Sequence, residues 1–406
     1  MSDQAQLGIA NYRKDSYIIV EGQQKSDCFF IIQRGKVRIS REVTVEGDSE
    51  EVLVPGDFFG VVSAMSSLSQ IESALALTDV ALISVRPQQY APLIQKNSPV
   101  AIKILMQLSS RLRFLDGALT SLSLKSGKKI EDDGPPILFD VGEFYYRHKQ
   151  YKQAFYAYSK YLRYCPGEKN FASAASRVKE LEDRVGDVKT DYGKGELNRT
   201  YQKGDMLFAE GELGDEFFVL QSGSVKISKI IDKKEVLLTT LTAGDIFGEM
   251  ALLEGKPRAA SALAGENCAV MAVNKANFEL MIKNQPQLIT RLTTLLANRI
   301  WFTFKQLEVT LMTNPLGKMY GALLIQLEKD RIDHKSAESH VFNARWGDLV
   351  KMLGLSEKEG FILMGELHKD KNINVREDRV HVASIKKLVK QADIYREIDA
   401  RKKARQ

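Results

Sequence analysis

One short segment, residues 247–260 (FGEMALLEGKPRAA), carries the residue types best suited to binding a small anionic ligand. Gly248 lets the backbone approach a ligand closely, and the run that follows can form a short helix whose N–H groups attract an anion. Arg258 offers a planar fork of donors that suits a phosphate. Glu249 would repel a phosphate, so we expect its carboxylate to accept a hydrogen bond from a neighbouring hydroxyl. One anion, one hydroxyl and a small pocket indicate a nucleotide with a ribose.

The whole segment resembles the phosphate-binding cassette of cyclic nucleotide-binding domains. The resemblance implies that Arg258 pairs with the cyclic phosphate, that Glu249 accepts the ribose 2′-hydroxyl, and that nearby backbone amides complete the cradle. Ala259 stands where cGMP-selective members tend to carry threonine, which favours cAMP over cGMP. The alternative is a capping glutamate beside a surface arginine. The residues expected to bind the nucleotide are Gly248, Glu249, Met250, Ala251, Arg258, Ala259, Arg299 and Thr303.

Arg299 and Thr303 enter that set through a second resemblance, in the helix predicted after the cassette. In transcription factors of the catabolite activator type, this helix carries an arginine and, four residues later, a threonine that reaches the adenine amino group. Residues i and i+4 of one helix share a face, so both side chains can point at the same base. Trp301, Phe302 and Phe304 could stack on that base, although packing is their default role.

These residues lie in a domain that the chain contains twice. DCFFIIQRGKVRIS, from Asp27, recurs as DEFFVLQSGSVKIS, from Asp215, a shift of 188 positions that also superposes residues 55–60 and 73–85 on later segments. Each copy is a series of short alternating segments punctuated by glycine, which predicts an antiparallel barrel or jelly roll. We call them copy one and copy two.

Copy one differs from copy two at the charged positions of the cassette that are expected to bind the nucleotide. Position for position, the replacements are Val61 for Glu249, Ser69 for Pro257 and Gln70 for Arg258. Without the guanidinium, a buried phosphate would lose a charge-assisted pair worth about 1.5–3 kcal/mol. We therefore predict that copy one is a structural barrel and binds no cyclic nucleotide.

A long helix is predicted after copy two, with an apolar stripe along one face. The stripe packs either on the chain's own barrel or against a second copy of the chain, and its length favours a homodimer. Its residues are Ile289, Leu292, Leu296, Ile300, Thr303, Leu307 and Leu311.

Residues 138–166, between the copies, predict a helical hairpin with the spacings of a tetratricopeptide repeat. Stacked arrays need about three repeats for stability, so a single repeat must pack on a neighbour. The hairpin is either a rigid spacer, whose tyrosine-rich face is core, or a site for a protein partner.

From Asn314 onward the sequence predicts helix, short turn, helix and hairpin, with a capping box between Ser356 and Glu359. This order resembles the winged helix-turn-helix of the Crp/Fnr transcription regulators, which also follows the long helix of their cyclic nucleotide domain. The resemblance covers about 210 residues from Asn198. The candidate DNA contacts are Ser356, Lys358, Lys369, Arg376 and Arg379.

Charge argues against tight DNA binding by this segment. Residues 345–379 hold seven basic and seven acidic side chains, although phosphate neutralisation supplies much of DNA affinity. The chain as a whole carries a net charge of +6, and its last 21 residues, 386–406, hold eight basic and three acidic side chains. Most of the net positive charge therefore lies outside the predicted recognition helix, in a tail that could bind DNA phosphates or an acidic partner.

Composition sets the remaining bounds. The 406 residues are 44% hydrophobic and 27% charged, which indicates a folded, multidomain chain. The fold class predicted is α+β, with two β-roll domains, a tetratricopeptide-like insert and a winged helix. The domains predicted are 1–125 (degenerate cyclic nucleotide-binding-like), 126–190 (helical linker), 191–312 (ligand-competent, with the long helix), 313–385 (winged-helix-like) and 386–406 (basic helical tail).

The function predicted is a cAMP-sensing regulator whose winged domain binds DNA, with a cAMP-controlled adaptor that binds protein as the alternative. Three isolated cysteines, without a CxxC pair, and the lack of a signal-like or membrane-spanning segment indicate the cytoplasm. The five histidines have no metal-ligand spacing, and neither a P-loop nor a Ser-His-Asp grouping is found, so we predict no metal and no enzyme.

Overall fold

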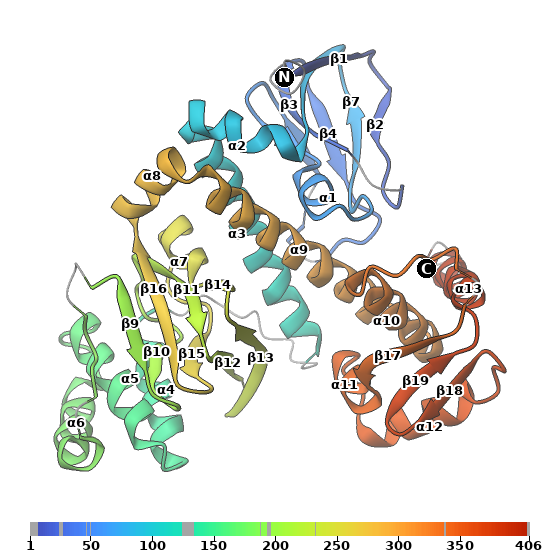
Figure 1. Ribbon diagram of the computed structural model, residues 1–406. Helices are drawn as coiled ribbons and strands as arrows, with labels where there is room; N and C mark the ends of the chain where they lie inside the picture. Colours follow the sequence, from blue (N-terminus) through green and yellow to red (C-terminus); the bar gives the residue numbers. More distant parts are fainter. Residues whose placement is uncertain are drawn as a thin grey trace. The chain divides into compact units, whose positions relative to one another are not determined.

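The computed structural model describes residues 7–23, 27–45, 47–48, 50–123, 134–186, 188–192, 196–231, 233–336 and 338–403 (Figure 1). These residues contain no helix long and apolar enough to cross a membrane. The chain divides into two compact units. Unit 1 comprises Met1–Pro87, Phe114–Lys129 and Leu296–Gln406, and unit 2 comprises Gln88–Arg113 and Ile130–Leu295.

Copy one forms an antiparallel barrel in unit 1, made of two four-stranded sheets with strand orders β1-β8-β3-β6 and β2-β7-β4-β5. Alternate residues of its short strands, such as Val37 and Ile39, are buried between the sheets. The short helix α1 (Val61–Ser66) lies between β6 and β7. The strands are β1 (Gly8–Tyr12), β2 (Tyr17–Ile19), β3 (Phe29–Arg34), β4 (Val37–Ser40), β5 (Glu51–Leu53), β6 (Phe58–Phe59), β7 (Ser73–Ala76) and β8 (Val80–Val85).

Copy two repeats this barrel in unit 2, with strand orders β9-β16-β11-β14 and β10-β15-β12-β13. Strand for strand this is the order of copy one, so the two β-roll domains predicted from the repeat are confirmed. The helix α7 (Glu249–Glu254) takes the place of α1. The strands are β9 (Asn198–Tyr201), β10 (Met206–Phe208), β11 (Glu216–Ser222), β12 (Ser224–Ile231), β13 (Lys234–Thr242), β14 (Ile246–Phe247), β15 (Ser261–Ala264) and β16 (Cys268–Asn274).

A short and a long helix follow each barrel: α2 (Pro87–Lys96) and α3 (Ser98–Ser123), then α8 (Lys275–Asn284) and α9 (Pro286–Thr310). Five positions of the predicted stripe on α9 are buried within the single chain, namely Ile289, Leu292, Leu296, Ile300 and Leu307. The stripe is therefore not the open dimer surface that its length suggested, and of the two alternatives the structure fits packing within the chain. The homodimer itself stays a prediction.

Three helices follow α3 along the chain, before β9: α4 (Ile137–Arg147), α5 (Tyr151–Tyr164) and α6 (Phe171–Val185). The helical hairpin predicted over residues 138–166 is present as α4 and α5. Gly142 permits their close approach, since a Cβ there would lie 2.6 Å from the Tyr158 ring. Tyr145, Tyr156 and Tyr161 are buried in a core that also includes Met206 of the barrel, so the tyrosine-rich face is core.

The C-terminal part belongs to unit 1 and contains α10 (Pro315–Lys329), β17 (His340–Arg345), α11 (Trp346–Met352), α12 (Glu357–Leu367), β18 (Ile373–Arg376), β19 (Arg379–Val382) and α13 (Ile385–Lys403). The sheet order is β17-β19-β18. The predicted capping box of Ser356 and Glu359 is confirmed at the start of α12. The predicted hairpin is confirmed as well: Arg376 pairs with Arg379 across a turn in which Glu377 and Asp378 have positive φ.

Candidate functional site

The cassette of copy two is built on a glycine that begins a helix. Gly248 is the N-cap of α7 and has φ of 76°, a left-handed conformation that favours glycine. A Cβ at this position would lie 2.6 Å from Nη1 of Arg258 and 3.3 Å from the Phe208 ring. Both the backbone conformation and the space therefore require glycine, and the guanidinium packs directly on the backbone where the helix begins.

Arg258 is only 6% exposed, and its guanidinium lies against the rings of Phe208 and Phe218 in the core of the barrel. Its guanidinium lies 4.3 Å from the centroid of the Phe208 ring, and its Nη1 donates to the Gly248 carbonyl. Burial lowers the pKa of Arg258 from its ordinary value, and the carboxylates of Glu212 and Glu249 act against that shift. The site thus holds a desolvated cation, whose pairing with an anion is stronger than it would be in water.

The structure brings the predicted cassette residues together. Glu249 is buried and close enough to Arg258 for its charge to act on the guanidinium. Met250 and Ala251 are buried in the first turn of α7, and the Ala259 carbonyl accepts a hydrogen bond from Nζ of Lys229 at 3.4 Å. A cation, a carboxylate and the start of a helix thus gather within one short segment.

The loop between β10 and β11, residues 209–215, completes the surroundings of Arg258. The sequence alone did not indicate a role for this loop. The backbone N–H of Arg258 donates to the Glu212 carbonyl at 2.8 Å, and the N–H of Gly211 donates to the Arg258 carbonyl at 2.9 Å. A Cβ on Gly214 would lie 2.4 Å from Cζ of Arg258. The loop thus fixes the backbone of Arg258 and leaves room for its guanidinium.

Arg299 and Thr303 lie on the part of α9 that belongs to unit 1, whereas the cassette belongs to unit 2. Their partner in unit 1 is Asp116 of α3: Oγ1 of Thr303 donates to Oδ1 at 3.3 Å, and Nη2 of Arg299 lies 3.7 Å from Oδ2. The two side chains share a face, as the i, i+4 spacing predicts. Contact with adenine stays a prediction.

In copy one, the position of the cassette carries different groups. Val61 and Gln70 are buried where copy two has its glutamate and arginine. The N–H of Gly60 donates to Oε1 of Glu72 at 3.1 Å, and Nη2 of Arg41 donates to Oε2 of the same carboxylate at 3.1 Å. Copy one therefore places its own carboxylate against the backbone N–H that corresponds to that of Gly248.

Each cassette is also contacted by the long helix of the other copy. In unit 2, Nη1 of Arg113, on α3, donates to the Pro257 carbonyl at 3.1 Å. In unit 1, Nε1 of Trp301, on α9, donates to the Ser69 carbonyl at 2.9 Å. A shift of 188 positions relates Arg113 to Trp301 and Ser69 to Pro257, so the two contacts are equivalent by sequence. No local sequence motif indicated that each long helix contacts the cassette of the other copy.

Arg113 and its neighbour Ser109 also contact the helix of the cassette. Nε of Arg113 lies 3.1 Å from Oε2 of Glu254, and Oγ of Ser109 donates to Oε1 of Glu254 at 2.8 Å. Both side chains of the ion pair are nearly buried. The last residue of α7 is thereby held by a helix of copy one.

The five candidate DNA contacts are dispersed over the C-terminal part. The Ser356 hydroxyl takes part in the cap of α12, and Lys369 pairs with Glu366 at 2.6 Å. Lys358, Arg376 and Arg379 are exposed. The exposed surface of α12 also carries two large apolar side chains, Phe361 at 76% and Ile362 at 59% exposure.

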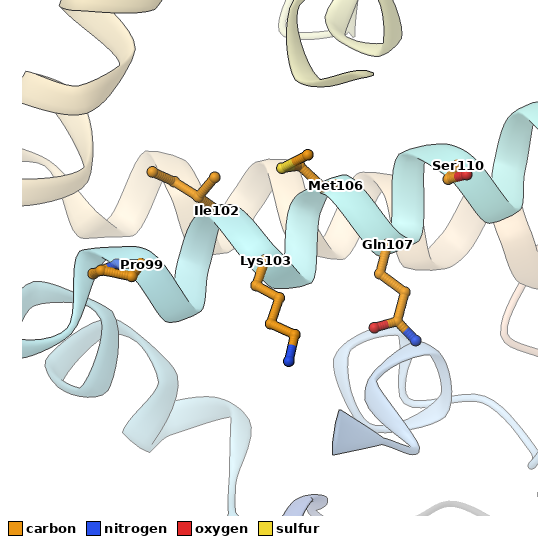
Figure 2. Close-up of a pocket in the computed structure, with 6 residues that line it drawn as sticks. All are labelled: Pro99, Ile102, Lys103, Met106, Gln107 and Ser110. Atoms are coloured by element: carbon orange, nitrogen blue, oxygen red, sulfur yellow. The ribbon is translucent and has the colours of Figure 1, made fainter. Parts of the chain in front are cut away.

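A shallow hollow on α3 is lined by residues of that helix alone, namely Pro99, Ile102, Lys103, Met106, Gln107 and Ser110 (Figure 2). Ile102 and Met106 point to one side of the helix, and Lys103 and Gln107 point to the other (Figure 2). Its polar groups do not converge, as those of a ligand site do. Among the described residues, no group of three or more His, Cys, Asp or Glu side chains could hold a metal ion.

Comparisons with known proteins agree with this geometry. The family model of the cyclic nucleotide-binding domain matches residues 9–97 and 198–285, one match for each barrel. A CRP-like cAMP-activated global transcriptional regulator of Mycobacterium tuberculosis is 30% identical over 125 residues, which are 30% of this chain and 56% of the regulator. The match thus spans little more than half the length of that relative.

One further relative and one solved structure are also similar to parts of this chain. A cAMP-dependent protein kinase regulatory subunit of Debaryomyces hansenii is 43% identical over 82 residues, 20% of this chain and 18% of the subunit. A solved structure of a CRP/FNR family transcriptional regulator from Thermus thermophilus is 19% identical, with a TM-score of 0.33, and the match covers 48% of this chain and 98% of that one. The chain thus carries two segments that match the cyclic nucleotide-binding domain, and parts of it are similar both to Crp-like regulators and to a kinase regulatory subunit.

Proposed function

We propose that copy two binds cAMP and that copy one does not. The observation that carries the proposal is the buried guanidinium of Arg258, held on the backbone of Gly248 beside the buried Glu249. Ala259, where cGMP-selective relatives tend to carry threonine, supports cAMP as the ligand. The full-length chain should bind one cAMP per chain by calorimetry, with weaker binding of cGMP. Binding of two cAMP per chain would overturn the assignment of copy one.

We further propose that the output is DNA binding by a winged helix at residues 313–385, aided by the basic tail 386–406. The first domain, 1–125, and the helical linker, 126–190, would then support the ligand-binding domain, 191–312. The order of the elements α11, α12, β18 and β19 supports this reading, as does the regulator of transcription among the relatives. Binding to genomic DNA fragments in mobility shifts, at low salt and with cAMP present, is the expected result.

A second output is favoured by one observation on α12. Phe361 and Ile362 are exposed side by side on the helix that would read DNA. A paired apolar surface of this kind suits a protein partner better than a base edge, and the Ser356 hydroxyl is engaged in the helix cap. The alternative is thus a cAMP-controlled adaptor in which α12 or the tetratricopeptide-like helices bind protein.

One experiment separates the two outputs. Phe361→Ser should leave DNA retention intact if the domain binds DNA through Lys358, Arg376 and Arg379, whereas Lys358→Ala should weaken it. The absence of any retention of the wild-type chain at low salt, with and without cAMP, would reject the DNA output in favour of the adaptor.

A further inference from the structure

The helical insert reaches the ligand-binding barrel through a buried ion pair. Nζ of Lys160, on α5, lies 2.9 Å from Oε1 of Glu212. Each residue is only 6% exposed. Burial acts to lower the pKa of Lys160, but the carboxylates of Glu212 and Asp191 act together with Tyr164 in the opposite direction and the pKa is raised, so the side chain is charged at neutral pH. A pair this deeply buried leaves an uncompensated charge when either partner is removed.

Tyr156, one turn before Lys160 on α5, contacts the same carboxylate. Its hydroxyl lies 3.1 Å from Oε2 of Glu212 and 3.1 Å from the Leu207 carbonyl. Burial and the nearby carboxylate raise the pKa of Tyr156 well above its ordinary value, so the hydroxyl remains a donor. The N–H of Ala209 donates to Oε2 of Glu212 at 3.0 Å. The insert and the loop thus share one buried acidic group.

Glu212 lies in turn against the phosphate-binding arginine of the proposed site. Its carbonyl accepts the backbone N–H of Arg258, and its carboxylate is the strongest of the charges that act on the Arg258 guanidinium. That carboxylate could therefore compete with a bound phosphate for Arg258. Lys160 and Tyr156 instead direct its oxygens toward α5.

We propose that Lys160 and Tyr156 of the helical insert are positioning residues for the cyclic nucleotide site: they hold the Glu212 carboxylate and so keep Arg258 available to the phosphate. The proposal rests on the proposed function of copy two. It gives the insert a role in ligand affinity, beyond that of a spacer. It also makes α4 to α6 a place from which a bound partner could alter cAMP affinity.

The test uses calorimetry with cAMP on full-length variants, with the melting temperature of each measured in parallel. Lys160→Met should weaken cAMP binding roughly tenfold, because Glu212 then turns its charge on Arg258. Lys160→Arg should retain wild-type affinity. The decisive variant is Lys160→Met combined with Glu212→Gln, which removes the competing carboxylate and should restore affinity to within about threefold of wild type.

Lys152→Met is the matched control, since Lys152 lies on the same helix and forms an exposed pair with Asp205 of the same barrel at 3.7 Å. Its cAMP affinity should equal that of wild type. Tyr156→Phe removes only the hydroxyl and replaces Lys160→Met as the test if the latter does not fold; a severalfold loss of affinity is expected.

Three outcomes overturn the proposal. One is wild-type affinity in folded Lys160→Met, and another is a double variant as weak as the single one, which would indicate a merely structural role. The third is a wild-type chain that binds no cAMP at all, which rejects the proposed function and this proposal with it. The wild-type titration therefore separates the two failures.

Discussion

In both copies of the barrel the cassette helix begins at a glycine with the same conformation. The two copies differ in the group that lies against the backbone N–H of that glycine. Gly60 and Gly248 both have φ of 76° at the N-cap. In copy one the Gly60 N–H meets the carboxylate of Glu72, which Arg41 neutralises, whereas copy two has Ala260 at the equivalent position. Copy one has thus built an anion into its own chain at the point where copy two would receive one.

The charges of the two arginines show the same contrast. Arg41 lies 3.1 Å from Glu72 and 3.6 Å from Asp48, so its charge is used within copy one. Arg258 forms no salt bridge within the part of the chain that the structure describes, and its short contact is to a backbone carbonyl. Under the proposed function, the pair of Glu72 and Arg41 takes in copy one the place that the phosphate and Arg258 take in copy two, so that the buried polar groups of both barrels have partners.

The largest expected effect comes from making copy two like copy one. Arg258→Gln removes the charge-assisted pair with the phosphate and should cost about 2–3 kcal/mol of binding free energy, roughly 30- to 150-fold in Kd for cAMP. Calorimetry on the full-length variant measures it. Gln70→Ala, at the equivalent position of copy one, is the control and should leave Kd unchanged. Equal affinity of Arg258→Gln and wild type would contradict the assignment of copy two.

A smaller loss is expected from the second difference between the cassettes. Glu249→Val introduces the copy-one residue and removes the proposed acceptor of the ribose hydroxyl, at a cost of about 1.5 kcal/mol, roughly tenfold in Kd. A 2′-deoxy analogue of cAMP provides the check, since the substitution should not weaken its binding further. A tenfold loss for the deoxy analogue as well would show that Glu249 acts on something other than that hydroxyl.

In copy one, the built-in anion should matter for stability and not for cAMP. Glu72→Gln leaves the nearly buried Arg41 with a weaker partner, and we expect the free energy of unfolding to fall by about 1–3 kcal/mol. Denaturant unfolding combined with hydrogen exchange of β4 and β7 measures the change. Glu50→Gln breaks the exposed pair with Arg38, at 3.8 Å, and should change little. A change in cAMP affinity in Glu72→Gln would contradict the separation of the copies.

Local patterns in the sequence were enough to predict the two barrels, the start of α12 and the grouping of the cassette residues. The repeat predicted both barrels, and Ser356 with Glu359 predicted the start of α12. The cassette pattern predicted that Gly248, Glu249 and Arg258 lie close together, as they do in the structure. Each of these signals lies within a few residues of the group it positions, or is repeated at a constant shift.

What the sequence did not reveal depends on pairs that are far apart along the chain. Lys160 meets Glu212 and Arg41 meets Glu72 only because the barrels fold, and neither pair forms a motif. The apolar stripe of α9 was ambiguous for another reason, since an apolar face that packs within the chain has the same periodicity as one that pairs two chains. Periodicity identifies the face, and only the fold supplies its partner.

A last contrast concerns two glutamates, one in each copy, that directly precede a glycine: Glu210 before Gly211 in copy two, and Glu21 before Gly22 in copy one. Glu210 of copy two pairs with Lys229 at 3.1 Å. Glu21 of copy one accepts the N–H of Glu42, yet burial raises its pKa from 4.5 to about 7, with smaller effects of Glu308, which raises it, and Lys305, which lowers it. A raised carboxyl pKa means that the folded state binds a proton more tightly than the unfolded state does.

The sign of the resulting pH dependence follows. The stability that the protonated Glu21 contributes is fully present below pH 4.5 and is lost as the pH rises through about 7. Glu21→Gln should therefore match wild type near pH 4.5 and unfold at higher denaturant concentration than wild type at pH 8. Glu210→Gln should do the opposite at pH 8, because it breaks a pair with Lys229. If both variants shift stability in the same direction at pH 8, the two loops do not differ in the way that their buried carboxylates indicate.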